Sequence, residues 1–138
     1  MRNAKSASER ADEFLMELVE FSSRCLEMLD TLPRDRAGVA NFRDQLSRSS
    51  TSIAANYTEA TAAESRRDFA AKIAVALKEA KESRTWLFII EKRGFCPSST
   101  MKPLLNEVNS FIRRLNASVT TARKRISAIE SRSKNEQA

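Results

Sequence analysis

The chain has 138 residues, of which 30% are charged and 41% hydrophobic, and its formal net charge is +6 at pH 7. That length fits a single domain able to bury a core without disulfides. The chain has no histidine, two glycines and two cysteines. It therefore lacks the commonest general base and metal ligand, a glycine-rich phosphate loop and a disulfide framework. We expect a non-catalytic protein with no catalytic residues, no metal and no cofactor.

The first amphipathic segment spans about residues 8–32. Apolar residues recur there every seven positions, which predicts a helix starting near Ser8, after a disordered stretch at residues 1–7. Pro33 ends it, because proline disfavours the α conformation in the preceding residue. The opposite face is acidic and suits either solvent or a basic partner. Its acidic residues are Glu9, Asp12, Glu13, Glu17, Glu20, Glu27 and Asp30.

Two further helices are predicted at about residues 39–62 and 65–93. Ser65 and Asp68 resemble a capping box at the start of the third helix. Gly94 suits the position after its last turn, and Pro97 prevents continuation. A fourth helix is expected at about 99–130, capped by Ser98 or Ser99, with residues 131–138 frayed. The chain thus predicts an all-α, antiparallel up-down-up-down four-helix bundle over residues 8–130.

Polar residues form a column on each of the two middle helices. At about 100° per residue, both columns lie beside apolar ones, so they are expected to face each other across the antiparallel pair. Because basic side chains accompany the glutamates and histidine is absent, a structural polar network is favoured over a metal site. This network comprises Arg48, Ser52, Asn56 and Glu59 on the second helix, and Lys72, Glu79 and Ser83 on the third.

The same region carries a family resemblance. The runs RSSTSIAANYTEA, from Arg48, and SRRDFAAKIAVALKEAKESRTWL, from Ser65, resemble the four-helix-bundle family typified by proteins encoded in intervening sequences of bacterial 23S ribosomal RNA. The accessory variability proteins of diversity-generating retroelements share that bundle. Many members have glycine after the motif glutamate, where this chain has Ala60. The resemblance implies the bundle fold, a homopentameric ring and, from the retroelement branch, a reverse transcriptase–RNA complex as a partner.

The basic charge is concentrated near the C-terminus. Residues 101–138 hold eight basic and three acidic residues, a net charge of +5. Such an array neutralises phosphates without reading sequence, which suits structured RNA. The candidate nucleic-acid-binding residues are Arg113, Arg114, Arg123, Lys124 and Arg125. They are also suited to meet the acidic first helix of a neighbouring subunit in a ring, or to form an ordinary solvated face.

The sequence therefore predicts a cytoplasmic oligomer that binds structured RNA or a ribonucleoprotein through a basic surface on the fourth helix. In a ring, each weak phosphate contact is repeated. The alternative is a structural adaptor ring that binds a protein partner and has no role with nucleic acid. No apolar run approaches the roughly 20 residues of a spanning helix, so no membrane partner is expected.

Overall fold

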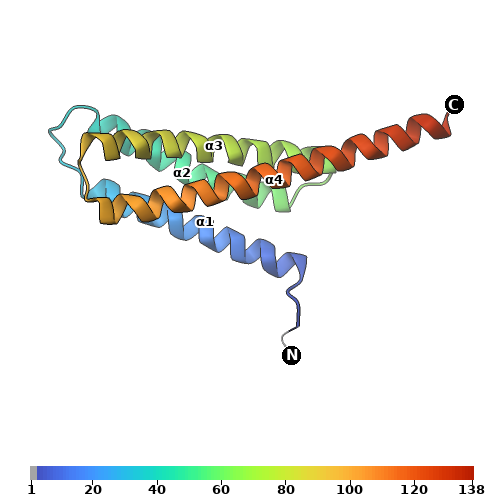
Figure 1. Ribbon diagram of the computed structural model, residues 1–138, viewed down its shortest axis with the longest axis horizontal. Helices are drawn as coiled ribbons and strands as arrows, with labels where there is room; N and C mark the ends of the chain where they lie inside the picture. Colours follow the sequence, from blue (N-terminus) through green and yellow to red (C-terminus); the bar gives the residue numbers. More distant parts are fainter. Residues whose placement is uncertain (1–2) are drawn as a thin grey trace.

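The computed structural model describes residues 3–138 and shows four helices joined by short connections (Figure 1). They are α1 (Ala7–Asp30), α2 (Val39–Thr61), α3 (Arg66–Arg93) and α4 (Ser98–Glu136). Successive helices run in opposite directions and pack against one another, which confirms the predicted all-α up-down bundle. Of the N-terminal stretch expected to be disordered, residues 1–2 lie outside the described residues.

The helix ends follow the local chemistry of the chain. The cap of α1 is Ser6, whose Oγ accepts from the Glu9 amide at 3.1 Å, so α1 begins slightly earlier than a start at Ser8 implies. The predicted cap of α3 is present, since the Asp68 amide donates to Ser65 Oγ at 3.0 Å. Gly94 ends α3 in the left-handed region at a φ of 69°, where glycine is favoured.

The fourth helix differs from the expectation at both ends. Pro97 stands at the N-cap of α4, and no side chain caps the helix, so neither Ser98 nor Ser99 has the predicted role. At the other end α4 continues to Glu136 instead of fraying from residue 131. Neither proline nor glycine follows Pro103 to interrupt it. Figure 1 shows these last turns extending beyond the other three helices.

The core is formed by the predicted apolar columns. Its fully buried side chains include Leu18 and Phe21 of α1, Leu46 and Ile53 of α2, Ile73 and Leu87 of α3, and Val108 and Leu115 of α4. Close packing of such columns is the main stabilisation of a bundle. The four helices do not pack against one another to the same extent, however. α1 packs mainly against α2, and its N-terminal half diverges from α4 (Figure 1). The bundle is consequently open at that end.

Buried serines join neighbouring helices. Ser22 Oγ of α1 donates to the Ser50 carbonyl of α2 at 2.8 Å, and Ser83 Oγ of α3 donates to Ser49 Oγ of α2 at 2.9 Å. All four residues are buried. Because serine is small, the helices approach closely, and the hydroxyls of Ser22, Ser49 and Ser83 find partners in doing so. The Ser50 hydroxyl is buried without a hydrogen-bond partner among residues 3–138.

Apolar residues beside the main heptad columns of α1 and α4 fall into two groups by exposure. Leu104 and Phe111 of α4 are each 3% exposed and belong to the bundle's own core, so they are not available to a partner. Val19 and Leu26 of α1 are 41% and 39% exposed, and Met16 beside them is 54% exposed. Among residues 3–138, no helix has an apolar stretch long enough to cross a bilayer.

Candidate functional site

The predicted polar columns of α2 and α3 face each other, but their charged members form two separate ion-pair clusters. Arg48 lies 3.3 Å from Glu79 and also pairs with Glu82. The hydrogen bond to Glu82 and the charge of Glu79 raise the pKa of Arg48. Nearer the α2–α3 turn, Lys72 lies 2.8 Å from Glu59, and this hydrogen bond raises the pKa of Lys72.

The uncharged members of the network bond to partners other than its charged residues. Asn56 donates to the Ser52 carbonyl within its own helix at 2.9 Å, and Ser83 bonds to Ser49. Neither reaches a glutamate in the hydrogen bonds within residues 3–138. The Arg48 side chain is 49% exposed, so its ion pairs lie at the surface of the α2–α3 pair. The network therefore ties two helices together, as a structural role requires, and it is only partly buried.

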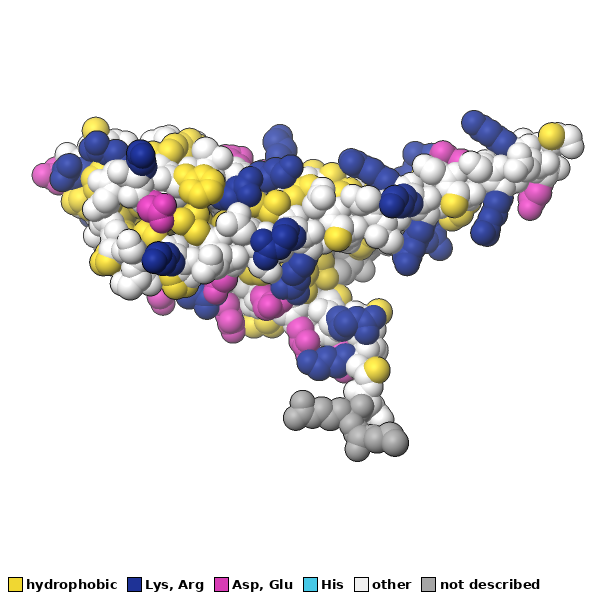
Figure 2. Space-filling model, viewed as in Figure 1, with side chains coloured by type: hydrophobic (Ala, Val, Ile, Leu, Met, Phe, Trp, Pro, Cys, Tyr) yellow, Lys and Arg dark blue, Asp and Glu magenta, His cyan; other side chains and the backbone are white. Residues whose placement is uncertain are grey.

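The five basic residues predicted on α4 do not share one face. At about 100° per residue, Arg113 and Lys124 fall on one line along the helix, Arg114 and Arg125 on a second, and Arg123 on a third. All five are exposed. Figure 2 shows Lys and Arg side chains spread along α4 to its protruding end, with Asp and Glu gathered along α1. The helix thus presents positive charge in three directions.

One of these arginines is engaged within the bundle. Arg114 donates to Glu17 of α1 at 2.7 Å, and its guanidinium lies 4.1 Å from the centroid of the Phe14 ring. These contacts join α4 to α1 where the two helices diverge. A phosphate that bound Arg114 would have to compete with the Glu17 carboxylate, so Arg114 is the least available of the five.

Arg123 lies instead in a groove between α3 and α4. Two adjoining hollows of about 440 and 450 Å³ both include Arg123 in their walls. Lys78 and Lys81 of α3 line the first hollow, together with Asn116 and Thr120 of α4. We call the strip formed by Lys78, Lys81, Asn116, Thr120 and Arg123 the basic groove.

The charge of the basic groove is uncompensated by carboxylates. Within residues 3–138, none lies within 4.0 Å of a cationic nitrogen of Lys78, Lys81 or Arg123. Arg67 and Glu130 also line the second hollow, where they form an ion pair with each other. Three free cations on a strip flanked by polar side chains are suited to successive phosphates of a nucleic-acid backbone.

The sequence interpretation missed the contribution of α3 to this groove. In the sequence, Lys78 and Lys81 belong to the run SRRDFAAKIAVALKEAKESRTWL that carries the family resemblance. Their spacing of three residues places them on one face of a helix, which was the available signal. Their position beside Arg123 depends on how α3 and α4 pack.

In the part of the chain that the structure describes, no three His, Cys, Asp or Glu side chains gather as a metal site would require.

Comparisons with known proteins agree with this fold. A family model described as 23S rRNA-intervening sequence protein matches residues 13–117. The chain is also similar to a protein of unknown function from the S23 ribosomal protein family of Bacteroides thetaiotaomicron VPI-5482, whose crystal structure is known. The two are 26% identical, with a TM-score of 0.70, over 80% of this chain and 97% of that one. No curated protein matches the chain.

Proposed function

This chain belongs to the 23S rRNA-intervening sequence protein family, and we propose that it is a non-catalytic oligomer that binds structured RNA through the basic groove. The observation that carries this function is the alignment of Lys78, Lys81 and Arg123 between α3 and α4, with no carboxylate within 4.0 Å of their cationic nitrogens among residues 3–138. Arg113 and Lys124 lie on the adjoining line of α4 and extend the positive surface.

The chemistry of the groove favours an RNA duplex or hairpin over an unpaired strand. Its cations suit phosphates, whereas single-strand binding usually adds aromatic side chains on which bases stack. No aromatic residue lines either hollow of the groove. The A-form minor groove exposes 2′-hydroxyls and flanking phosphates to shape recognition, and Asn116 and Thr120 offer polar partners there. A reverse transcriptase with its template RNA, the partner that the family resemblance implies, would present structured RNA to this groove.

Self-association is the second part of the proposed function. Met16, Val19 and Leu26 form an exposed apolar stripe on α1, among acidic residues. A second copy covering this stripe with a basic face would make a heterologous contact, which closes into a ring when the rotation permits. We propose such a ring on this basis, and its homopentameric size is what the family resemblance implies. Val19→Asp combined with Leu26→Asp should lower the mass measured by light scattering to that of one chain, while the circular dichroism spectrum stays helical.

An adaptor without nucleic-acid function is the alternative. The same apolar stripe, with the acidic residues of α1, is suited to a protein partner that has a basic, apolar helix of its own. In that case the stripe would carry the function, and neutralising the basic groove would leave binding of that partner unchanged.

Binding to RNA is tested by fluorescence anisotropy with a labelled hairpin and a labelled unpaired strand of equal length. We expect the hairpin to bind more tightly at physiological salt, and both affinities to fall steeply as salt rises. Absence of binding at low salt, where attraction to phosphate is strongest, would contradict RNA binding and favour the adaptor.

A further inference from the structure

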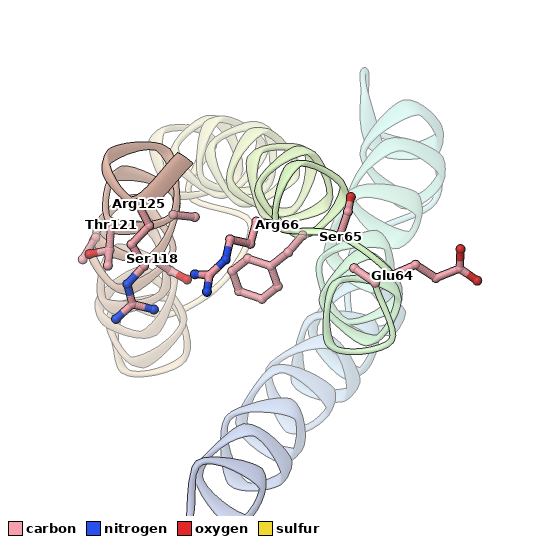
Figure 3. Close-up of a pocket in the computed structure, with 10 residues that line it drawn as sticks. Glu64, Ser65, Arg66, Ser118, Thr121 and Arg125 are labelled. Atoms are coloured by element: carbon pink, nitrogen blue, oxygen red, sulfur yellow. The ribbon is translucent and has the colours of Figure 1, made fainter. Parts of the chain in front are cut away.

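A second hollow, separate from the basic groove, lies at the end of the bundle where α1 diverges from α4. Its volume is about 570 Å³, within the usual range of small-molecule sites. Its walls come from the α2–α3 turn, the first turn of α3 and the middle of α4 (Figure 3). We call it the turn pocket and define it by Ser65, Arg66, Phe69, Ser118, Thr121 and Arg125.

The turn pocket has two cationic side chains on opposite walls. Arg66 extends from α3 toward α4, and Arg125 lines the pocket from α4 (Figure 3). Neither arginine has a carboxylate within 4.0 Å among residues 3–138. The one acidic residue in the wall, Glu64, directs its carboxylate away from the pocket in Figure 3. The interior is therefore positively charged, which favours an anion.

The donors around these arginines fit a phosphate better than a simple carboxylate. Hydroxyl groups of Ser118 and Thr121 are in the α4 wall, and a phosphomonoester has three terminal oxygens to share among two guanidinium groups and such hydroxyls. The first turn of α3 forms part of the opposite wall and adds the positive end of its dipole. Phe69, which is half-buried, supplies an apolar surface beside them.

We propose that the turn pocket binds the terminal phosphate of a nucleotide, either free or at the 5′ end of an RNA. The two guanidinium groups and the α4 hydroxyls hold the phosphate, and the ring of Phe69 lies against the attached nucleoside. The α4 residues that line the turn pocket and the α4 residues that line the basic groove lie on different sides of the helix. A 5′-end contact would thus add to groove binding, but binding of a free nucleotide does not depend on the groove.

The test is isothermal titration of the protein with AMP and adenosine, alongside 5′-phosphorylated and 5′-hydroxyl forms of one short RNA. We expect AMP to bind with a dissociation constant below about 1 mM and adenosine to bind at least tenfold more weakly. Tighter binding of the phosphorylated RNA than of its hydroxyl form, beyond the preference for AMP, would identify an RNA end as the source. Preference for AMP alone would identify a free nucleotide.

Variants separate the pocket from the general positive charge. Arg66→Gln combined with Arg125→Gln should weaken AMP binding tenfold or more. Lys92→Gln with Lys134→Gln, which removes the same charge from exposed sites elsewhere, should leave it unchanged. Ala117→Trp fills the pocket from an exposed position and should also abolish binding without removing a charge.

Equal binding of AMP and adenosine, no AMP binding, or unchanged binding in the pocket variants would each overturn the assignment. These outcomes are distinguishable from failure of the proposed RNA binding, because that function is read from hairpin affinity and from variants of Lys78, Lys81 and Arg123. If the protein binds hairpins but not AMP, RNA binding in the basic groove is supported and only the assignment of the turn pocket is overturned.

Discussion

Neutralising the basic groove should remove a defined part of the salt dependence of RNA binding. In the variant Lys78→Gln, Lys81→Gln, Arg123→Gln, three phosphate contacts are lost. Each contact contributes about 0.9 to the slope of log affinity against log salt for a duplex, so the slope should fall by about 2.7. Over a tenfold change in salt concentration, a slope of about 2.7 corresponds to a roughly 500-fold change in affinity. The three contacts should therefore contribute roughly 500-fold more to the affinity at 0.1 M salt than at 1 M. Wild type and variant should therefore differ most at low salt and converge near 1 M.

Fluorescence anisotropy of a labelled hairpin across this salt range measures both slopes. The matched control is Lys92→Gln, Lys102→Gln, Lys134→Gln, which has the same net charge but changes exposed lysines outside the groove. Its slope should remain close to that of the wild type. If the two triple variants lose affinity and slope equally, RNA responds only to total charge, and the reasoning from the groove is wrong.

Three further predictions concern the bundle itself. Ser83→Ala should lower the free energy of unfolding by about 1–3 kcal/mol, because the buried Ser49 hydroxyl loses its partner. Urea denaturation measures this loss, and adding Ser49→Ala should not increase it. Ile73→Ala, at a position with 0% exposure, should cost about 2–5 kcal/mol in the same assay. Burial, with the nearby charge of Glu107, raises the pKa of the Cys25 thiol to about 12. The unfolded chain releases this proton near pH 9 and the folded chain does not, so the free energy of unfolding should fall by up to about 1.4 kcal/mol per pH unit above that value. Cys25→Ala should remove this slope, and a slope that persists in the variant would show that another group is responsible.

Much of the fold could be predicted from the sequence because the period of the apolar residues determines it. The recurrence of Leu18 and Cys25, and of Leu115 and Ala122, at seven positions identifies helices with one buried face. The same period continues through Phe14, so nothing in the pattern indicates that α1 diverges from α4. That divergence depends on how the helices cross.

The candidate site could be predicted only in part, because pairing depends on packing between helices. The concentration of positive charge on α4 is evident from composition. Composition does not show which of these arginines are free to bind a ligand. Arg114 pairs with Glu17, which is ninety-seven positions away in the chain. Arg123 lies beside Lys78 and Lys81 only once α3 and α4 are packed. Such partners depend on the rotation of each helix, which the periodicity alone does not specify.

The basic groove is tested most directly by locating RNA on the protein. Ultraviolet crosslinking of the wild-type protein to a hairpin, followed by mass spectrometry of the crosslinked peptides, identifies the residues in contact. We predict crosslinks on α3 around Lys78 and Lys81 and on α4 between Asn116 and Arg123. Crosslinks confined to α1, or none at low salt, would contradict RNA binding in this groove.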